Sequence, residues 1–294
     1  MPLHFMTRGR SAAGFSAAAA LLLTLSACSS GSPTATAPST AAAGLPSSHV
    51  HGLSVNPQTD QVLLATHEGL FDVTKQPKSP ATQIGETNDL MGFTAAADQG
   101  VFYASGHPGP GSDMPNPMGL IRSADGGKTW EQLSRQGESD FHALATAKSG
   151  IIAYDGTLQT SPDGKTWTPA AAGFVPAVLA GNPETDTVLA TTREGLQRST
   201  DGGKTWSLNT AAPVIQFVAF ASGTEVFGVE PGGAVHYSTD AGSTWTQTGS
   251  IKGQVQAITA VKKTDGKPTI WAATTEGIVV STDGGNLFRT PPGA

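Results

Sequence analysis

Cysteine is almost absent from this sequence, because Cys28 is the only one among 294 residues. A disulfide within one chain is therefore impossible. Charged side chains are also scarce, at 14% of the chain, and the formal net charge is −6. Arginine is especially rare, and the arginines beyond Cys28 are Arg122, Arg135, Arg193, Arg198 and Arg289. An acidic, arginine-poor surface argues against nucleic acid as a partner.

Several catalytic signatures are missing as well. The chain has no nucleophile elbow around a Ser or Cys, no phosphate-cradling glycine loop and no His-Glu-x-x-His string. A hydrophobic run long enough for a comfortable transmembrane helix is also missing, since the apolar stretch 12–25 is short and rich in alanine. Function must therefore be sought in other patterns.

The first residues have the pattern of an export signal. Arg8 and Arg10 precede the apolar stretch, which ends in Leu25-Ser-Ala-Cys28. This string resembles the lipobox of bacterial lipoproteins, which implies a signal peptide over residues 1–28 and a lipid on Cys28. Residues 29–48 are rich in Ser, Thr, Ala and Pro and carry no charge, which predicts a flexible tether. We expect a protein anchored by lipid to the extracytoplasmic face of the cell membrane.

One eight-residue string organises the remainder of the chain. Ser-Thr-Asp-Gly-Gly-Lys-Thr-Trp at 199–206 returns in variant form at 123–130, 238–245 and 281–288, and one residue shorter at 161–167. The aromatic residues that end the copies are Trp130, Trp167, Trp206, Trp245 and Phe288, so the steps are 37, 39, 39 and 43 residues. A period near 40 indicates stacked supersecondary units.

The chemistry of the string is that of a tight turn. Asp-Gly-Gly reverses the chain because Gly adopts positive φ without steric cost, short polar side chains bond the turn's own amides, and Trp anchors the hairpin. The residues expected in this structural role are Ser123, Asp125, Trp130, Ser161, Asp163, Trp167, Ser199, Asp201, Trp206, Ser238, Asp240, Trp245, Ser281 and Asp283. The string resembles the Asp-box, or BNR, repeat of β-propellers. Such boxes occur in bacterial sialidases, sortilin-type receptors and photosystem assembly factors, so they imply a fold and not a function.

Residues 49–294 are therefore predicted to form an all-β, six-bladed β-propeller of four-stranded antiparallel blades. With the strands of a blade named a to d from the centre outward, each box is a c–d turn, and the first blade, 49–86, has no box. The starts of strands a and the b–c loops then meet on the face opposite the boxes, where function is usual in propellers.

Histidine gathers on that face. The starts of the first three strands a read His49-Val-His51, Asp89-Leu-Met91 and Asp140-Phe-His142, and the b–c loops add His67 and His107. Because side chains two apart on a strand share a face, His51, Met91 and His142 should lie on equivalent positions. The second positions in the other three blades are Pro176, Gln216 and Gln256.

This alignment predicts a metal site at the mouth of the central channel, with His51, Met91 and His142 at its centre. His67, His107, His49, Asp89 and Asp140 would assist. Imidazole with thioether favours copper, and zinc is the second choice. The plainer alternative is a polar channel lining bonded to water and backbone.

Two other functions stay open. Strings such as His49-Val-His-Gly-Leu and His67-Glu-Gly-Leu-Phe resemble secreted bacterial Asp-box proteins labelled glycosyl hydrolase or sialidase-like, which implies an exo-acting glycosidase with a glycan ligand. A sialidase needs an arginine cluster and a tyrosine with a glutamate partner, and arginine is rare here, so we expect binding rather than catalysis. The third possibility is a metal-free module that docks an extracytoplasmic protein, which an exposed apolar patch around Phe141 and the loop 106–118 would favour.

Overall fold

The computed structural model describes residues 45–46, 49–263 and 265–291. The predicted signal peptide, the lipidation of Cys28 and nearly all of the predicted tether lie outside these residues and stay predictions. No helix in the described part of the chain is long and apolar enough to cross a membrane.

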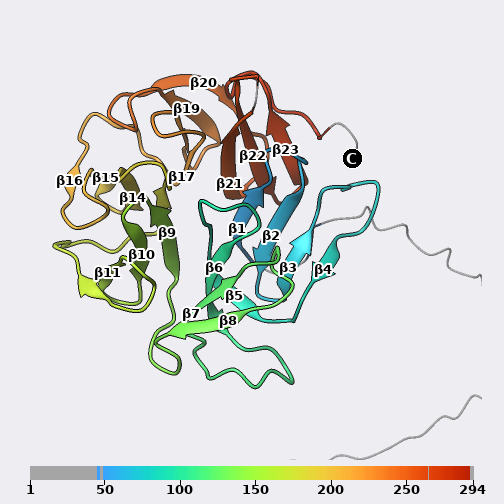
Figure 1. Ribbon diagram of the computed structural model, residues 1–294. Helices are drawn as coiled ribbons and strands as arrows, with labels where there is room; N and C mark the ends of the chain where they lie inside the picture. Colours follow the sequence, from blue (N-terminus) through green and yellow to red (C-terminus); the bar gives the residue numbers. More distant parts are fainter. Residues whose placement is uncertain (1–44, 47–48, 264, 292–294) are drawn as a thin grey trace, which may run out of the picture. The chain divides into compact units, whose positions relative to one another are not determined.

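Within the described residues, 23 strands form six antiparallel sheets arranged in a ring (Figure 1). The first three sheets are β1 (Val50–Val55), β2 (Val62–Thr66), β3 (Gly69–Asp72) and β4 (Thr82–Ile84); β5 (Asp89–Ala95), β6 (Phe102–His107), β7 (Leu120–Ser123) and β8 (Glu131–Ser134); and β9 (Ala143–Ala147), β10 (Gly150–Tyr154), β11 (Leu158–Ser161) and β12 (Thr168–Pro169). The other three are β13 (Val178–Gly181), β14 (Val188–Thr192), β15 (Gly195–Ser199) and β16 (Ser207–Leu208); β17 (Phe217–Phe220), β18 (Val226–Val229), β19 (Ala234–Ser238) and β20 (Thr246–Ser250); and β21 (Val255–Lys262), β22 (Pro268–Thr274) and β23 (Gly277–Ser281).

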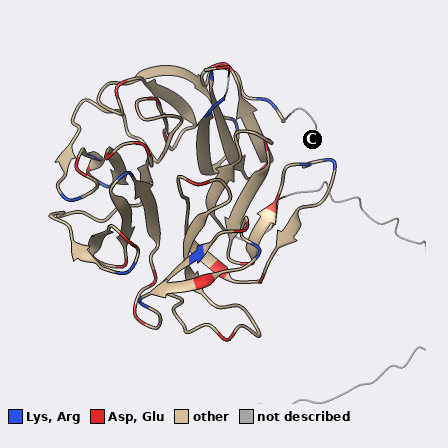
Figure 2. Ribbon diagram, viewed as in Figure 1, with Lys and Arg blue, Asp and Glu red and all other residues tan. Residues whose placement is uncertain are grey.

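The predicted six-bladed propeller is confirmed. Each sheet is a meander in chain order, and in the sixth blade an isolated bridge between Val280 and Arg289 takes the place of a fourth strand. The innermost strands β1, β5, β9, β13, β17 and β21 contact one another in turn, and β21 contacts β1 to close the ring. Lys, Arg, Asp and Glu lie mainly in loops and on outer strands (Figure 2).

The apolar core is divided among the junctions between blades. Six clusters of buried side chains each combine residues from two neighbouring sheets. Phe141 is fully buried against Trp167, and Met118 is fully buried between the first two blades. The apolar patch that would have favoured a docking module is therefore absent at these described residues, because its side chains are part of the core.

The Asp-box turns make the bonds expected from their chemistry. Ser199 Oγ accepts the Gly203 N–H at 2.9 Å and donates to Asp201 Oδ1 at 2.7 Å, and Asp201 Oδ1 accepts the Thr205 N–H at 2.9 Å. Gly203 has φ 84° and packs so closely on Ile152 that an added Cβ would lie 2.8 Å from its Cγ1. A side chain at this position would therefore push two blades apart.

Three of the boxes, at 161–167, 199–206 and 238–245, also bond the blade before them. Ser134 Oγ donates to the carbonyl of Gly164 at 2.6 Å, and Asn209 Nδ2 donates to that of Gly242 at 2.9 Å. The N–H of Ala171 donates to the carbonyl of Lys204 at 2.9 Å. These boxes therefore form hydrogen bonds between blades as well as turns within them.

The first blade has no box, so the junction that closes the ring is held differently. Trp271 on β22 is 4% exposed and packs in one cluster with Val50, Val73 and other side chains of the first blade. Lys263 Nζ lies 2.7 Å from Asp60 Oδ1 across the same junction. Burial of apolar surface and this ion pair thus hold a junction that has no Asp-box.

The boxes predict a specific acid sensitivity. Partial burial raises the pKa of Asp201, but hydrogen bonds from Thr205 and Ser199 outweigh it and lower that pKa to about 2. A carboxylate whose pKa is lower in the folded than in the unfolded state stabilises the fold when the pH is above its pKa in the unfolded state. This stabilisation is lost as the pH falls toward the pKa in the folded state. Asp201→Asn should therefore lower the Tm most above about pH 4, and its difference from wild type should shrink toward about pH 2. Asp113→Asn, at an exposed aspartate outside the boxes, is the control in the same thermal scans; a pH-independent effect of Asp201→Asn would contradict the assignment.

Candidate metal site at the channel mouth

A β-bulge places the side chains at the mouth of the channel. Val50 pairs with Thr66 and Gly52 pairs with Ala65, so His51 is an extra residue in β1. The same register shift makes Met91 extra in β5 and Gln256 extra in β21. Bulges bend a strand and re-aim a side chain, and they are common beside functional sites.

The other three blades have an equivalent feature just before the inner strand. In each of these blades, the residue just before the inner strand donates its N–H to a carbonyl of the second strand. The acceptor is the residue that pairs with the first residue of the inner strand. The three bonds are His142 to Tyr154, Ala177 to Thr191 and Gln216 to Val229. Position 177 is thus the fourth-blade equivalent of His51, and the alignment on Pro176 was wrong by one residue. Proline has no N–H to make this bond.

Three imidazoles of the first blade meet at this mouth. His51 Nε2 lies 3.3 Å from both ring nitrogens of His67, and the His49 ring centroid is 5.5 Å from that of His51 and 5.9 Å from that of His67. One ring nitrogen from each of the three residues lies within 4.8 Å of the others. His49, His51 and His67, which we call the triad, could therefore hold a metal ion.

Asp89 of the second blade adds a carboxylate to the triad. Its Oδ2 is 2.9 Å from His67 Nδ1, and its Oδ1 is 3.9 Å from His51 Nε2. That Oδ1 is buried and has no hydrogen-bond partner among the described residues. A buried carboxylate oxygen without a partner is costly, so the position favours a cation.

Burial keeps the central imidazole neutral. His51 is 11% exposed, against 42% for His67. Burial and the neighbouring His67 lower the pKa of His51 to about 4, although Asp89 acts in the opposite direction. A neutral imidazole has a lone pair free for a metal, so His51 is ready to bind one at neutral pH without losing a proton.

The remaining candidates form a second group. Asp140 Oδ2 lies 2.7 Å from His142 Nε2 and 3.2 Å from His107 Nε2. Asn116, which the sequence analysis did not predict as part of a site, has its Oδ1 2.7 Å from His107 Nδ1. The sequence grouped His51 and His142 with Met91, but the structure brings these two histidines to different partners. Met91 lines the channel, as both histidines do.

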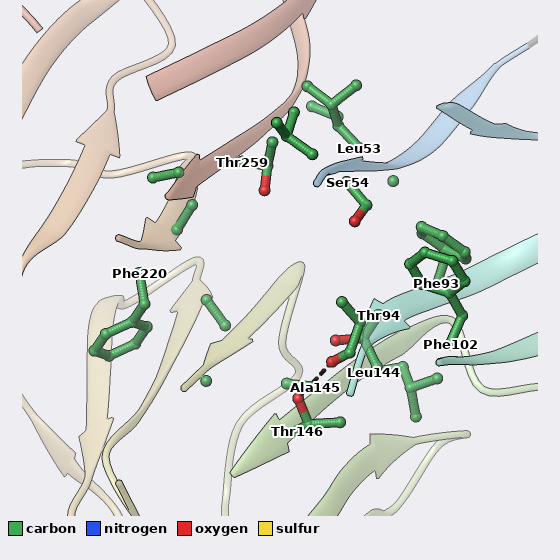
Figure 3. A pocket seen from close by; sticks show the side chains of 18 of the residues that line it. Leu53, Ser54, Phe93, Thr94, Phe102, Leu144, Ala145, Thr146, Phe220 and Thr259 are labelled. Atoms are coloured by element: carbon green, nitrogen blue, oxygen red, sulfur yellow. Dashed lines mark hydrogen bonds between the residues drawn. The ribbon is translucent and has the colours of Figure 1, made fainter. Parts of the chain in front are cut away.

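The channel below the mouth is mostly uncharged. It has a cavity volume of about 500 Å³ and is lined by the innermost strands of all six blades. Figure 3 shows apolar side chains such as Leu53 and Phe220 and hydroxyl side chains such as Ser54 and Thr259 in the channel lining. A bond from Thr146 Oγ1 to the carbonyl of Ala95 at 2.7 Å joins the third blade to the second. The titratable groups at the mouth thus stand above a weakly polar channel.

Comparisons with known proteins agree with this architecture. The model of the BNR/Asp-box repeat matches residues 197–208. No curated protein matches the sequence. The GH74 xyloglucanase from Xanthomonas campestris is similar in structure, with a TM-score of 0.56 and 17% identity over 84% of this chain and 38% of that chain. The GH74 enzyme from Niastella koreensis gives 0.54 and 18% over 82% and 37%.

A smaller protein of known structure matches along nearly its whole length. YCF48 bound to D1 peptide has a TM-score of 0.54 and 15% identity, over 82% of this chain and 95% of that chain. The present chain spans less than two fifths of the GH74 enzymes. At these identities the likeness shows the fold alone. The chain is a six-bladed β-propeller that contains a BNR/Asp-box repeat.

Proposed function

We propose that this propeller is an extracytoplasmic metal-binding module that holds one copper ion on the triad, with zinc as the second choice. The observation that carries the proposal is the convergence of ring nitrogens from His49, His51 and His67 within 4.8 Å. His49 directly precedes β1, His51 is the bulged residue of β1 and His67 lies in the β2–β3 turn, so one blade supplies the whole set.

The donor set supports a transition metal over a purely structural role. Three imidazoles with a carboxylate at their edge suit copper and zinc, and divalent copper binds nitrogen donors more tightly than zinc does. Asp89, whose Oδ2 is 2.9 Å from His67 Nδ1, orients that ring as outer carboxylates do at metal sites. Met91, which lines the same channel as His51, offers a thioether that would add affinity for Cu(I).

Catalysis of the sialidase type has less support. The tyrosine with a glutamate partner is Tyr237, whose hydroxyl donates to Glu225 Oε1 at 2.6 Å. Burial and Glu225 raise the pKa of Tyr237, which opposes its use as a nucleophile. Tyr237 precedes the box of the fifth blade, on the face opposite the histidines. At the mouth itself, Asp89 and Asp140 are each engaged by imidazoles.

The test is a metal titration of the full chain, purified in detergent without a polyhistidine tag. Cu(II), Cu(I) and Zn(II) are added separately in competition with chelators of known affinity. We expect tight Cu(II) binding that falls at least about 100-fold in His51→Ala/His67→Ala. His236→Gln, at a histidine that contacts Glu230 on the fifth blade, should bind as wild type does.

Met91→Leu separates the two oxidation states. If the thioether is a ligand, this variant loses affinity for Cu(I) and keeps its affinity for Cu(II). Binding no tighter than micromolar for all three ions in the wild type, or an undiminished affinity for Cu(II) in the double variant, would reject the triad as the metal site.

A further inference from the structure

We propose a second metal site, formed by His107, Asp140 and His142, that takes a divalent cation of the zinc type. It extends the proposed function by a second ion, but it rests on its own residues at the boundary of the second and third blades. His107 ends β6, and Asp140 and His142 precede β9. Two imidazole nitrogens meet one carboxylate oxygen there, at 3.2 and 2.7 Å.

The hydrogen bond to Asn116 leaves a lone pair facing the carboxylate. Asn116 Oδ1 is an acceptor, so His107 Nδ1, 2.7 Å away, carries the hydrogen of that bond. In a neutral imidazole the other nitrogen, Nε2, then has a lone pair, and it faces Asp140 Oδ2 at 3.2 Å. Two acceptors at that distance need a cation between or beside them, which can be a proton or a metal ion.

The carboxylate has further capacity for a cation. Asp140 Oδ1 is buried and has no hydrogen-bond partner among the described residues. An ionised carboxylate accepts through both oxygens, and leaving one buried and unbonded is unfavourable. A metal ion bound by the carboxylate and the two imidazoles would remove this deficit.

The backbone around Asp140 is fixed on both sides. Ser139 Oγ donates to Asp155 Oδ2 at 2.6 Å and accepts from Arg135 Nε at 2.6 Å. On the other side the N–H of Phe141 donates to Ser105 Oγ at 2.9 Å, and its ring is fully buried. A ligand held by packing and hydrogen bonds loses little freedom when a metal binds, which favours affinity.

The donors predict the metal. Two imidazoles and one carboxylate contain no sulfur, and this N₂O set suits zinc, with an open position for water or a ligand. The triad has three imidazoles from the first blade, so the two sites differ in composition as well as in location.

The test uses the full chain with the triad removed by His51→Ala/His67→Ala. We expect this variant to bind one equivalent of Zn(II), and to bind one equivalent of Co(II) with the absorption bands of a low-symmetry site. Both signals should be lost on adding Asp140→Asn, a change of similar size. Far-UV circular dichroism and the Tm confirm that each variant is folded. A folded triad-deficient variant that binds no Zn(II) tighter than micromolar overturns the second site and leaves the triad proposal standing.

Asn116 supplies an independent readout. As a positioning residue for His107, Asn116→Ala should weaken Zn(II) binding about 10–100-fold, the range known for outer partners of metal ligands. Asn116→Asp should restore it, because a carboxylate also accepts from Nδ1–H. In the triad-deficient variant, equal Zn(II) affinities with and without Asn116→Ala would contradict the assigned role. If Asp140→Asn alone abolishes Zn(II) binding and the intact triad binds no metal, the first proposal is rejected and this one stands.

Discussion

Trp271→Ala is expected to lower the free energy of unfolding by about 3–5 kcal/mol, the cost typical of removing a large buried aromatic side chain. The effect should be large because Trp271 packs at the one junction where no Asp-box fastens the neighbouring blade. Urea unfolding followed by circular dichroism measures it. Trp206→Ala, at a half-buried box tryptophan, should cost less.

A second substitution tests the cause. The indole N–H of Trp271 is buried without a hydrogen-bond partner among the described residues. Trp271→Phe removes this donor and keeps most of the apolar contact, so it should cost far less than alanine, within about 1.5 kcal/mol. If Trp271→Ala lowers the free energy of unfolding by less than Trp206→Ala does, the closing junction does not limit stability.

Gly92→Ala is expected to lower the free energy of unfolding by about 1–3 kcal/mol, because it forces extra volume into a packed position. An added Cβ would lie 2.2 Å from the carbonyl oxygen of Phe141, so the inner strands of the second and third blades would have to separate. Asp140 and His142 flank Phe141, so a local shift of Phe141 should weaken Zn(II) binding at the proposed second site.

Two other glycines serve as matched controls. An added Cβ at Gly181 would lie 2.2 Å from the carbonyl oxygen of Thr146, so Gly181→Ala should cost as much stability but leave Zn(II) binding unchanged. Gly173 has open space around it, and Gly173→Ala should be neutral or slightly stabilising. If Gly92→Ala and Gly181→Ala weaken Zn(II) binding equally, the link between Phe141 and the site is wrong.

The fold was predictable because its signal is local. A box such as 199–206 contains all the partners of its own hydrogen bonds, so its presence in five copies indicates five hairpins without knowledge of the remainder. The role of the boxes between blades was not predictable, because the bond from Asn209 to Gly242 joins residues 33 apart.

The members of the candidate site were predictable, but their grouping was not. Strict alternation along a strand predicted that His49 lies further out than His51 and that His51 lies on the same site as His142. The bulge at His51 breaks that alternation and brings His49, His51 and His67 together. A bulge depends on pairing with another strand, so the first strand's own sequence does not reveal it. Asn116 was missed for a similar reason, since only the folded loop brings it to His107.

The recurrence of the bulge makes the channel mouth a template for design. Six equivalent positions ring it, and only three of them carry His or Met. The bulge that presents His51 recurs at Gln256, and Ala177 and Gln216 hold the equivalent position just before their strands, so a ligand introduced at any of these joins the same ring of positions. Since β21 lies beside β1, histidine at position 256 would stand next to the triad. Coordination number in this protein could thus be altered by single substitutions, with no remodelling of the backbone.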